Sequence, residues 1–197
     1  SERVAMDDAD RVVREYADTG YDIIWVHGGR YNTAARAVAG EYPGVTFILE
    51  VDGEPEQPIS NVWYLDRNSY TGFYVLGSLA ALQTETGVVG FIGGVETPGA
   101  RGEVNAILQA LRDLESDATL DYTFVGDFDD PAGARAAAEG LIERGADVIV
   151  SAVIAGNAGI YRAIEAAGRS VYITTTYTDT YDQAPESFMT SEIFAFG

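Results

Sequence analysis

The sequence predicts an α/β protein of two doubly wound lobes, each built on a parallel β-sheet, with the first lobe incomplete. Strand-like and helix-like patterns alternate along the whole chain, which is typical of parallel α/β sheets. The strands at 88–92 and 148–150 are continuous apolar runs, as expected when helices cover both faces of a sheet. In addition, one sequence pattern occurs twice.

The repeated pattern is the end of a helix, a glycine, a polar step and a buried apolar strand. It occupies residues 15–25 and again 142–150, and its two glycines, Gly20 and Gly145, lie 125 residues apart. The aspartates two residues further on keep the same offset. Two copies in one internal order predict two lobes of one architecture, and small molecules are commonly held between such lobes.

The repeat also predicts that part of the first lobe lies outside this sequence. Before its copy of the pattern, the second half has a strand at 88–93, a helix at 102–114 and a strand at 122–126, whereas the first half has only a short segment. A strand–helix–strand unit of about 40 residues is therefore expected ahead of the first helix. Two genuinely asymmetric lobes are the alternative.

Local signals place each predicted element in turn. Asp7 or Asp8 can cap a first helix, which ends at Gly20, and Pro55 and Pro58 mark a loop between two strands. A long apolar helix follows, with small residues that allow close packing. The predicted elements are, in order, a helix at 8–17, a strand at 21–26, a helix at 33–41, strands at 45–51 and 61–65, a helix at 69–83, a strand at 88–93, a helix at 102–114, a strand at 122–126, and alternating helices and strands to residue 175.

The domain organisation follows from these elements. The first lobe is predicted to comprise residues 1–85 and 176–197, and the second lobe residues 86–175. The segment from Phe188 to Phe196 is expected to return to the first lobe.

The chain is strongly acidic. It has 31 acidic residues against 12 basic ones, all of them Arg, and a net charge of −19. Such a charge argues against nucleic acid and anionic membrane surfaces as partners. An acidic surface without Lys suits solubility at high salt, so a halophilic source is expected. An acidic protein of a GC-rich organism is the alternative.

The composition also limits the chemistry. The chain has no Cys, which excludes disulfides, zinc–thiolate sites and thiol catalysis. Its 47% apolar content is that of a globular protein. No apolar run approaches the roughly 18 residues of a membrane-spanning helix.

Candidate ligand-binding residues gather where the strands are predicted to end, the edge at which open α/β sheets bind ligands. Carboxylates and an amide there can bond hydroxyl or amine groups, aromatic faces can stack on a ring, and glycines let a ligand approach the backbone. These residues are His27, Gly28, Gly29, Tyr31, Asp66 and Arg67 in the first lobe, and Gly94, Glu96, Asp127, Phe128, Gly156 and Asn157 in the second.

Several candidates also have a structural explanation. His27, the only histidine, could act as a general base, but a hydrogen-bonded turn residue is the simpler interpretation. Asp130 before Pro131 is most simply a helix N-cap. Arg67 could bind an anion or pair with Asp66.

Neither a metal nor a cofactor is predicted. The acidic residues at 127, 129 and 130 do not have the spacing of a calcium-binding loop. Gly93 and Gly94 could approach a phosphate, but no Gly-Lys-Ser/Thr sequence follows them and the chain has no dinucleotide-binding fingerprint.

Five segments resemble the basic membrane protein family, whose members are solute-binding proteins of ABC transporters. They keep the family's order and spacing over nearly the whole chain. The segments are GFYVLGSLAA at 72–81, GVVGFIGG at 87–94 with Pro98, FDDPA at 128–132, GADVI at 145–149, and APESF at 184–188 with Thr190 and Ser191.

The resemblance implies a type I periplasmic-binding fold, in which three crossovers join two lobes, and a sequence that lacks both ends of the family's chain. It also implies an ABC permease as partner and a position at the extracellular membrane face or in the periplasm, with a membrane anchor in the full-length protein. Several members bind purine nucleosides and often carry an Asp-Ser-Asp-type turn, whose first carboxylate grips ribose. The corresponding residues here are Tyr177, Thr178 and Asp179, so Tyr177 and Asp179 join the candidate site.

The function expected from these observations is that of a solute-binding protein of an ABC importer, which captures a small polar ligand such as a nucleoside. A ligand-sensing domain of a regulator or signalling protein is the alternative. An enzyme using His27 is a third. A homodimer through the incomplete first lobe is also expected, because unpaired strand edges favour association.

Overall fold

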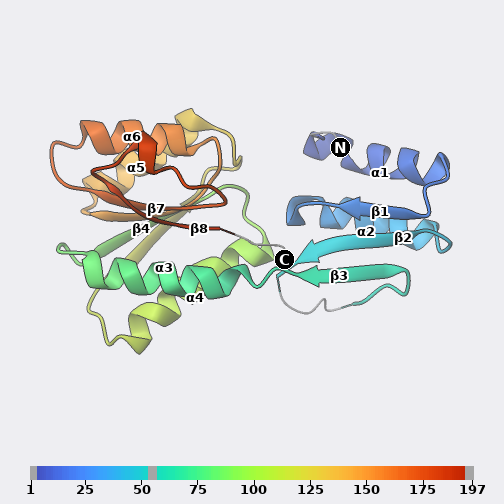
Figure 1. Cartoon of the computed structure of the whole chain (residues 1–197), viewed down its shortest axis with the longest axis horizontal. Coiled ribbons are helices and arrows are strands. Elements are labelled where there is room, and N and C mark those ends of the chain that lie inside the picture. The colour runs from blue at the N-terminus through green and yellow to red at the C-terminus, as the bar shows by residue number, and fades with distance from the viewer. Residues whose placement is uncertain (1–3, 53–56, 194–197) are drawn as a thin grey trace. The chain divides into compact units, whose positions relative to one another are not determined.

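The computed structural model describes residues 4–52 and 57–193, which form two compact units (Figure 1). The first unit extends to Asn68 and the second begins at Ser69.

The first unit is a three-stranded parallel sheet in the order β1-β2-β3. Two helices and two short 3-10 turns accompany it. Its elements are η1 (Met6–Asp8), α1 (Ala9–Asp18), β1 (Ile23–Val26), η2 (Gly29–Tyr31), α2 (Asn32–Glu41), β2 (Thr46–Val51) and β3 (Val62–Asp66).

Among residues 4–52 and 57–68, the core of the unit lies on one face of this sheet. Val13 of α1 and Val38 of α2 are buried in one cluster with Phe47 and Leu49 of β2. On the other face, Trp25 and Trp63 leave 59% and 72% of their surface exposed. The strand register places Ile48 opposite both tryptophans.

The second unit is a five-stranded parallel sheet in the order β5-β4-β6-β7-β8. Strands and helices alternate through it until the last two strands. Its elements are α3 (Ser69–Gln83), β4 (Val88–Gly93), α4 (Pro98–Asp113), β5 (Thr119–Phe124), α5 (Pro131–Glu143), β6 (Val148–Ala152), α6 (Asn157–Ala166), β7 (Tyr172–Thr176), η3 (Tyr181–Gln183) and β8 (Phe188–Glu192).

Helices cover both faces of this sheet (Figure 1). Val89 and Phe91 of β4 join the core of α3 and α4, whereas Ile92 joins the core of α5 and α6. All residues of β6 are buried. The predicted α/β class with parallel sheets is confirmed, and the apolar runs have the predicted cause.

Two segments differ from the predicted division into lobes. Helix α3 packs on α4 in the second unit. The ring of Phe73 in α3 also meets that of Phe91 in β4 edge-on, with centroids 6.0 Å apart. Strand β8 pairs with β7 rather than joining the first unit's sheet, because Met189 packs into the α3–α4 core and Thr174 to Thr176 align with 190–192. Residues 194–196 of the predicted return lie outside the described residues.

One predicted helix start and one predicted cap bond also differ. Helix α4 begins at Pro98 rather than at 102, because the Thr97 hydroxyl accepts a hydrogen bond from the Ala100 N–H at 3.1 Å. Asp8 does occupy the N-cap position of α1, but its carboxylate binds Arg11 at 3.2 Å and makes no cap bond.

Candidate functional site

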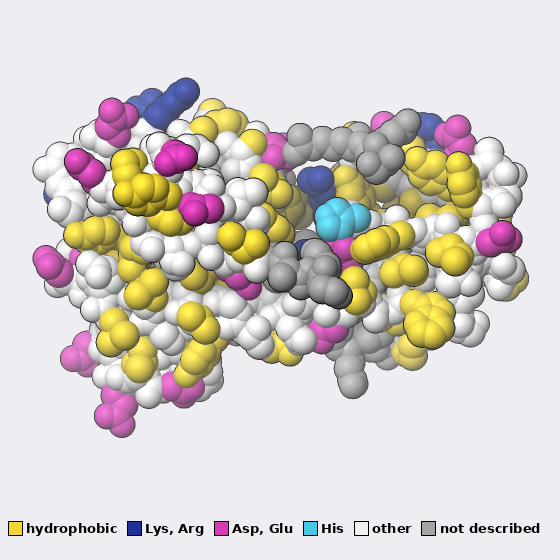
Figure 2. All heavy atoms as spheres, in the orientation of Figure 1, with side chains coloured by type: hydrophobic (Ala, Val, Ile, Leu, Met, Phe, Trp, Pro, Cys, Tyr) yellow, Lys and Arg dark blue, Asp and Glu magenta, His cyan; other side chains and the backbone are white. Residues whose placement is uncertain are grey.

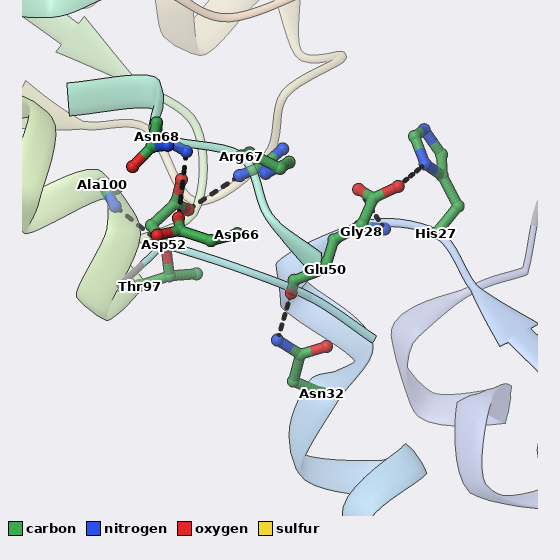
Figure 3. A network of polar contacts seen from close by, with 10 residues as sticks. All are labelled: His27, Gly28, Asn32, Glu50, Asp52, Asp66, Arg67, Asn68, Thr97 and Ala100. Carbon is green, nitrogen blue, oxygen red and sulfur yellow. Dashed lines mark hydrogen bonds and ion pairs between the residues drawn. The ribbon is translucent and has the colours of Figure 1, made fainter. Parts of the chain in front are cut away.

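In the first unit, contacts of the Glu50 side chain join the carboxyl ends of β1 and β2 (Figure 3). Glu50, near the end of β2, is fully buried. Its Oε1 lies 2.5 Å from His27 Nδ1, and its Oε2 accepts a hydrogen bond from the Gly28 N–H at 3.2 Å. One buried carboxylate thus holds both residues that follow β1.

The backbone of this turn depends on a glycine. Gly28 has a φ of 103°, in the region that other residues rarely adopt. Asn32, at the start of α2, donates from its Nδ2 to the Glu50 carbonyl at 2.7 Å and so ties the helix to β2. Tyr31 donates its hydroxyl to the Val4 carbonyl at 2.6 Å, and Gly29 begins η2.

The end of β3 forms a second polar group in the first unit. Arg67 donates to Asp52 Oδ2 at 2.9 Å, and both side chains are largely buried. Asp66 instead accepts from the Asn68 N–H at 3.0 Å. Arg67 is therefore in an ion pair, but with Asp52 rather than the predicted Asp66.

In the second unit, Gly94, Phe128 and Gly156 come together. A Cβ atom at Gly94 would lie 2.4 Å from Phe128 Cδ1, so the ring packs directly on the glycine. The Phe128 carbonyl accepts hydrogen bonds from the N–H groups of Ile154 and Gly156 at 2.9 and 3.2 Å. The hydrogen bonds join the loops that follow β5 and β6, and the packing of Phe128 on Gly94 joins them to the loop after β4.

The acidic residues after β5 organise their own loop. Asp127 Oδ1 accepts from the Asp129 N–H at 3.0 Å. Asp130 caps α5 by accepting from the Ala132 N–H at 2.9 Å, with Pro131 in the first turn. The predicted N-cap is confirmed. Across residues 4–52 and 57–193, no group of three or more His, Asp or Glu could hold a metal ion.

Two other second-unit candidates already have partners. Glu96 pairs with Arg101 at 2.8 Å on the surface. Asn157 is buried, and its Oδ1 accepts from Ser151 Oγ at 2.6 Å while its Nδ2 donates to the Val153 carbonyl at 3.1 Å. The Asn157 amide therefore holds the turn between β6 and α6.

The turn after β7 carries the last two candidates. Tyr177 has a φ of 72°, unusual for a residue other than glycine, and its N–H donates to the Glu192 carbonyl at 2.7 Å. Asp179 Oδ1 accepts from the Tyr181 N–H at 2.9 Å. Tyr177 is more than one-third exposed.

Glu50 was not among the site residues predicted from the sequence. A lone acidic residue in the otherwise apolar strand Thr46–Val51 was the available signal, because a buried carboxylate needs hydrogen-bond donors around it.

Comparison with known proteins places the whole chain in one group. The profile of the family described as "ABC transporter substrate-binding protein PnrA-like" matches residues 2–196.

No helix within the described part of the chain is long and apolar enough to cross a membrane.

Three curated relatives illustrate the range of this group. Basic membrane protein A2 of Borrelia garinii is 26% identical over 88% of this chain and 52% of its own length. A putative ABC transporter glucose-binding protein of Haloferax volcanii is 30% identical over 76% of this chain and 37% of its own. A purine-binding protein of Brucella abortus is 27% identical over 72% and 40%. The chain thus spans about half the length of these relatives, or less.

Solved structures share the fold. A solute-binding protein of an Aeropyrum pernix ABC transporter has a TM-score of 0.78 and 20% identity, over 96% of this chain and 55% of its own. A transcriptional activator of Bacillus halodurans has a TM-score of 0.68 and 22% identity, over 96% and 64%.

Proposed function

This chain belongs to the PnrA-like family of ABC transporter substrate-binding proteins, and we propose that it captures a small polar ligand, in particular a nucleoside, for an importer. Membership confirms the resemblance found in the sequence, and it is membership of a solute-binding family rather than an enzyme family. The observation that carries the proposal is that polar and aromatic groups end the parallel strands of both units, where such sheets bind ligands.

The side chains suit a hydroxylated ring compound. Phe128 packs on Gly94 and offers an aromatic face. In Asp127 and Asp179, the Oδ1 atom accepts a hydrogen bond from the N–H group two residues further on. A carboxylate has further acceptor sites for ribose hydroxyls. The Brucella relative is named for purine binding and the Haloferax relative for glucose binding, and both ligands are polar rings.

Thermal unfolding with a ligand panel tests this proposal. Nucleosides, nucleobases, sugars and amino acids would be compared in about 2 M KCl, where self-repulsion is screened. A ligand that binds only the folded state at 100 times its Kd adds about 2.7 kcal/mol. A rise in Tm with nucleosides alone supports a nucleoside as the ligand, whereas a rise with sugars alone indicates that the ligand is a sugar. No rise with any compound contradicts ligand capture by this chain.

The cellular setting belongs to the same proposal. A substrate-binding protein of an importer acts at the extracellular face of the membrane or in the periplasm, where it delivers its ligand to an ABC permease. A sensory role is the second candidate, favoured by the likeness of fold to a transcriptional activator. Binding to the transporter's permease in a pull-down supports transport, whereas a signalling domain fused in the full-length gene supports sensing.

We also propose that two copies associate through the uncovered face of the first unit's sheet. The repeat provides the comparison: Trp25 corresponds to Val150, which is fully buried under α3 and α4, whereas Trp25 is 59% exposed. Figure 2 shows hydrophobic side chains on the face that β1 to β3 present. An apolar sheet face of this kind favours association.

Light scattering at increasing KCl tests the association. Because the chain carries a net charge of −19, salt should promote dimers by screening repulsion. Trp63→Glu should remain monomeric, whereas Leu82→Glu, at an equally exposed site on α3, should not change the dimer fraction. A wild-type chain that stays monomeric at high protein and salt concentration contradicts the proposal.

A further inference from the structure

We propose that Glu50 holds the imidazole of His27 as its Nδ1–H tautomer, so that Nε2 accepts a hydrogen bond from an N–H or O–H group of an uncharged ligand. This inference deepens the proposed function and rests on it. It assigns Glu50 as a positioning residue and His27 as a determinant of ligand class.

The position of the proton follows from the two bonds of Glu50. An ionised carboxylate only accepts hydrogen bonds. The Gly28 N–H donates to Oε2 at 3.2 Å, so this oxygen acts as an acceptor. The other oxygen, Oε1, lies 2.5 Å from His27 Nδ1. Opposite an ionised Glu50, Nδ1 carries the hydrogen, and the second ring nitrogen of the neutral imidazole has a free lone pair.

The pair combines a buried anchor with an open ring. The Glu50 side chain is 0% exposed, whereas that of His27 is 77% exposed, and the histidine is visible at the surface in Figure 2. Gly28 sets the backbone turn directly after His27, and Asn32 binds the backbone carbonyl of Glu50. The structure thus sets the ring's orientation while most of the His27 side chain stays exposed.

This arrangement selects a chemical class. A lone pair on Nε2 attracts a hydrogen-bond donor, while the Glu50 charge behind the ring disfavours an anion. Nucleosides and neutral sugars carry suitable hydroxyl and N–H groups. Nucleotides and sugar acids add a negative charge, so the site should discriminate against those whose anionic group faces His27.

Nitrogen-15 NMR can read the tautomer directly, because the chain has one histidine. In the neutral ring of the wild-type chain, we expect a protonated Nδ1 and an unprotonated Nε2. In Glu50→Gln, the amide oxygen should accept from Gly28, which turns the amide NH₂ toward Nδ1 and reverses the tautomer. Glu41→Gln, a change at an exposed ion pair on α2, is the control and should leave the tautomer unchanged. A wild-type ring protonated at Nε2 overturns the proposal.

Ligand titrations test the second half of the proposal. The probes are inosine and D-glucose, each compared with its charged counterpart, inosine monophosphate or D-glucuronate. A bound neutral probe should shift the Nε2 resonance and bind more tightly than its counterpart. Glu50→Gln and His27→Leu should each weaken binding about tenfold, whereas His27→Gln, which keeps an acceptor, should retain most of it. Binding that is unaffected in both Glu50→Gln and His27→Leu overturns the role of His27.

The two proposals can fail separately. If neither probe nor any compound of the panel raises the Tm, ligand capture fails and the proposed ligand contact falls with it, whereas the ligand-free spectra still establish the tautomer. If a probe binds but the Nε2 resonance stays unchanged, only the present inference fails.

Discussion

The ring of Phe128 lies so close to Gly94 that a methyl group on the glycine would come within 2.4 Å of Phe128 Cδ1. The residue after β4 therefore determines where the aromatic side chain after β5 can lie. Because both follow strand ends of one sheet, this contact joins the packing of the second unit to its candidate site.

Gly94→Ala should displace the Phe128 ring and lower the free energy of unfolding by about 1–3 kcal/mol, the usual cost of overpacking. Urea unfolding measures the loss, and ligand affinity should fall with it. Gly102→Ala is the control, since a Cβ there meets no atom within 4 Å. Its position in α4 should make it neutral or stabilising. Equal stability of the two variants would contradict the close packing of Phe128 on Gly94.

Gly28→Ala should destabilise the first unit by about 1–2 kcal/mol, because φ at Gly28 is 103°. The strain should also weaken the bond between Glu50 and the residue 28 N–H, and the His27 nitrogen resonances should report the change. Gly29→Ala is matched to it, because Gly29 has no positive φ. If Gly29→Ala costs as much as Gly28→Ala, the backbone account of this turn is wrong.

Tyr177→Gly should separate stability from binding. Relief of the left-handed backbone, with a φ of 72°, should offset the lost side-chain packing to within about 1 kcal/mol. If the ring contacts the ligand, affinity should fall although the fold is retained. Calorimetric Tm and ligand Kd are the two measurements. Unchanged affinity would remove Tyr177 from the site.

Asp147 anchors the turn that precedes β4. Its carboxylate accepts from Thr84 Oγ1 at 2.5 Å and from the N–H groups of Glu85 and Thr86 at 2.7 and 3.0 Å. Burial raises the pKa of Asp147, but these hydrogen bonds, with Thr84 first among them, outweigh burial and lower it below the usual 3.8.

Asp147→Asn should lower the free energy of unfolding at neutral pH by about 1–2 kcal/mol, because the amide presents a donor where donors already converge. A lowered pKa in the folded state stabilises the wild type above the unfolded value, and the advantage is lost as the pH falls below about 4. Urea unfolding from pH 7 to pH 3 measures how the difference in stability between the wild type and Asp147→Asn shrinks. The repeat supplies a control: the Asp22 carboxylate is exposed, with no hydrogen bond to any described residue, and Asp22→Asn should change stability by less than about 0.5 kcal/mol. A wild-type advantage that does not decline as the pH falls below about 4 would contradict the assignment.

The sequence predicted those elements that are marked by nearby residues, such as an apolar run or a helix cap. The apolar runs of β4 and β6 reflect helices on both sheet faces, and Asp130 with Pro131 caps α5 as expected. The start of α4 was missed although Thr97 and Pro98 give a similar signal.

Contacts between distant segments could not be predicted in the same way. Arg67 pairs with Asp52 rather than with adjacent Asp66, because the ends of β2 and β3 lie side by side. His27 and Glu50 come from the ends of two different strands, so the sequence can indicate a buried carboxylate at Glu50 but not its partner. The place of β8 depends on its register with β7 and not on its own composition.

The central claim, that this chain captures a small polar ligand without transforming it, is tested most directly by isothermal titration calorimetry with inosine and D-glucose, followed by recovery of the ligand. The account predicts saturable 1:1 heat with at least one of them and chemically unchanged ligand after prolonged incubation. Absence of saturable heat with these two compounds and with every other compound of the panel, or recovery of a converted product, would contradict it.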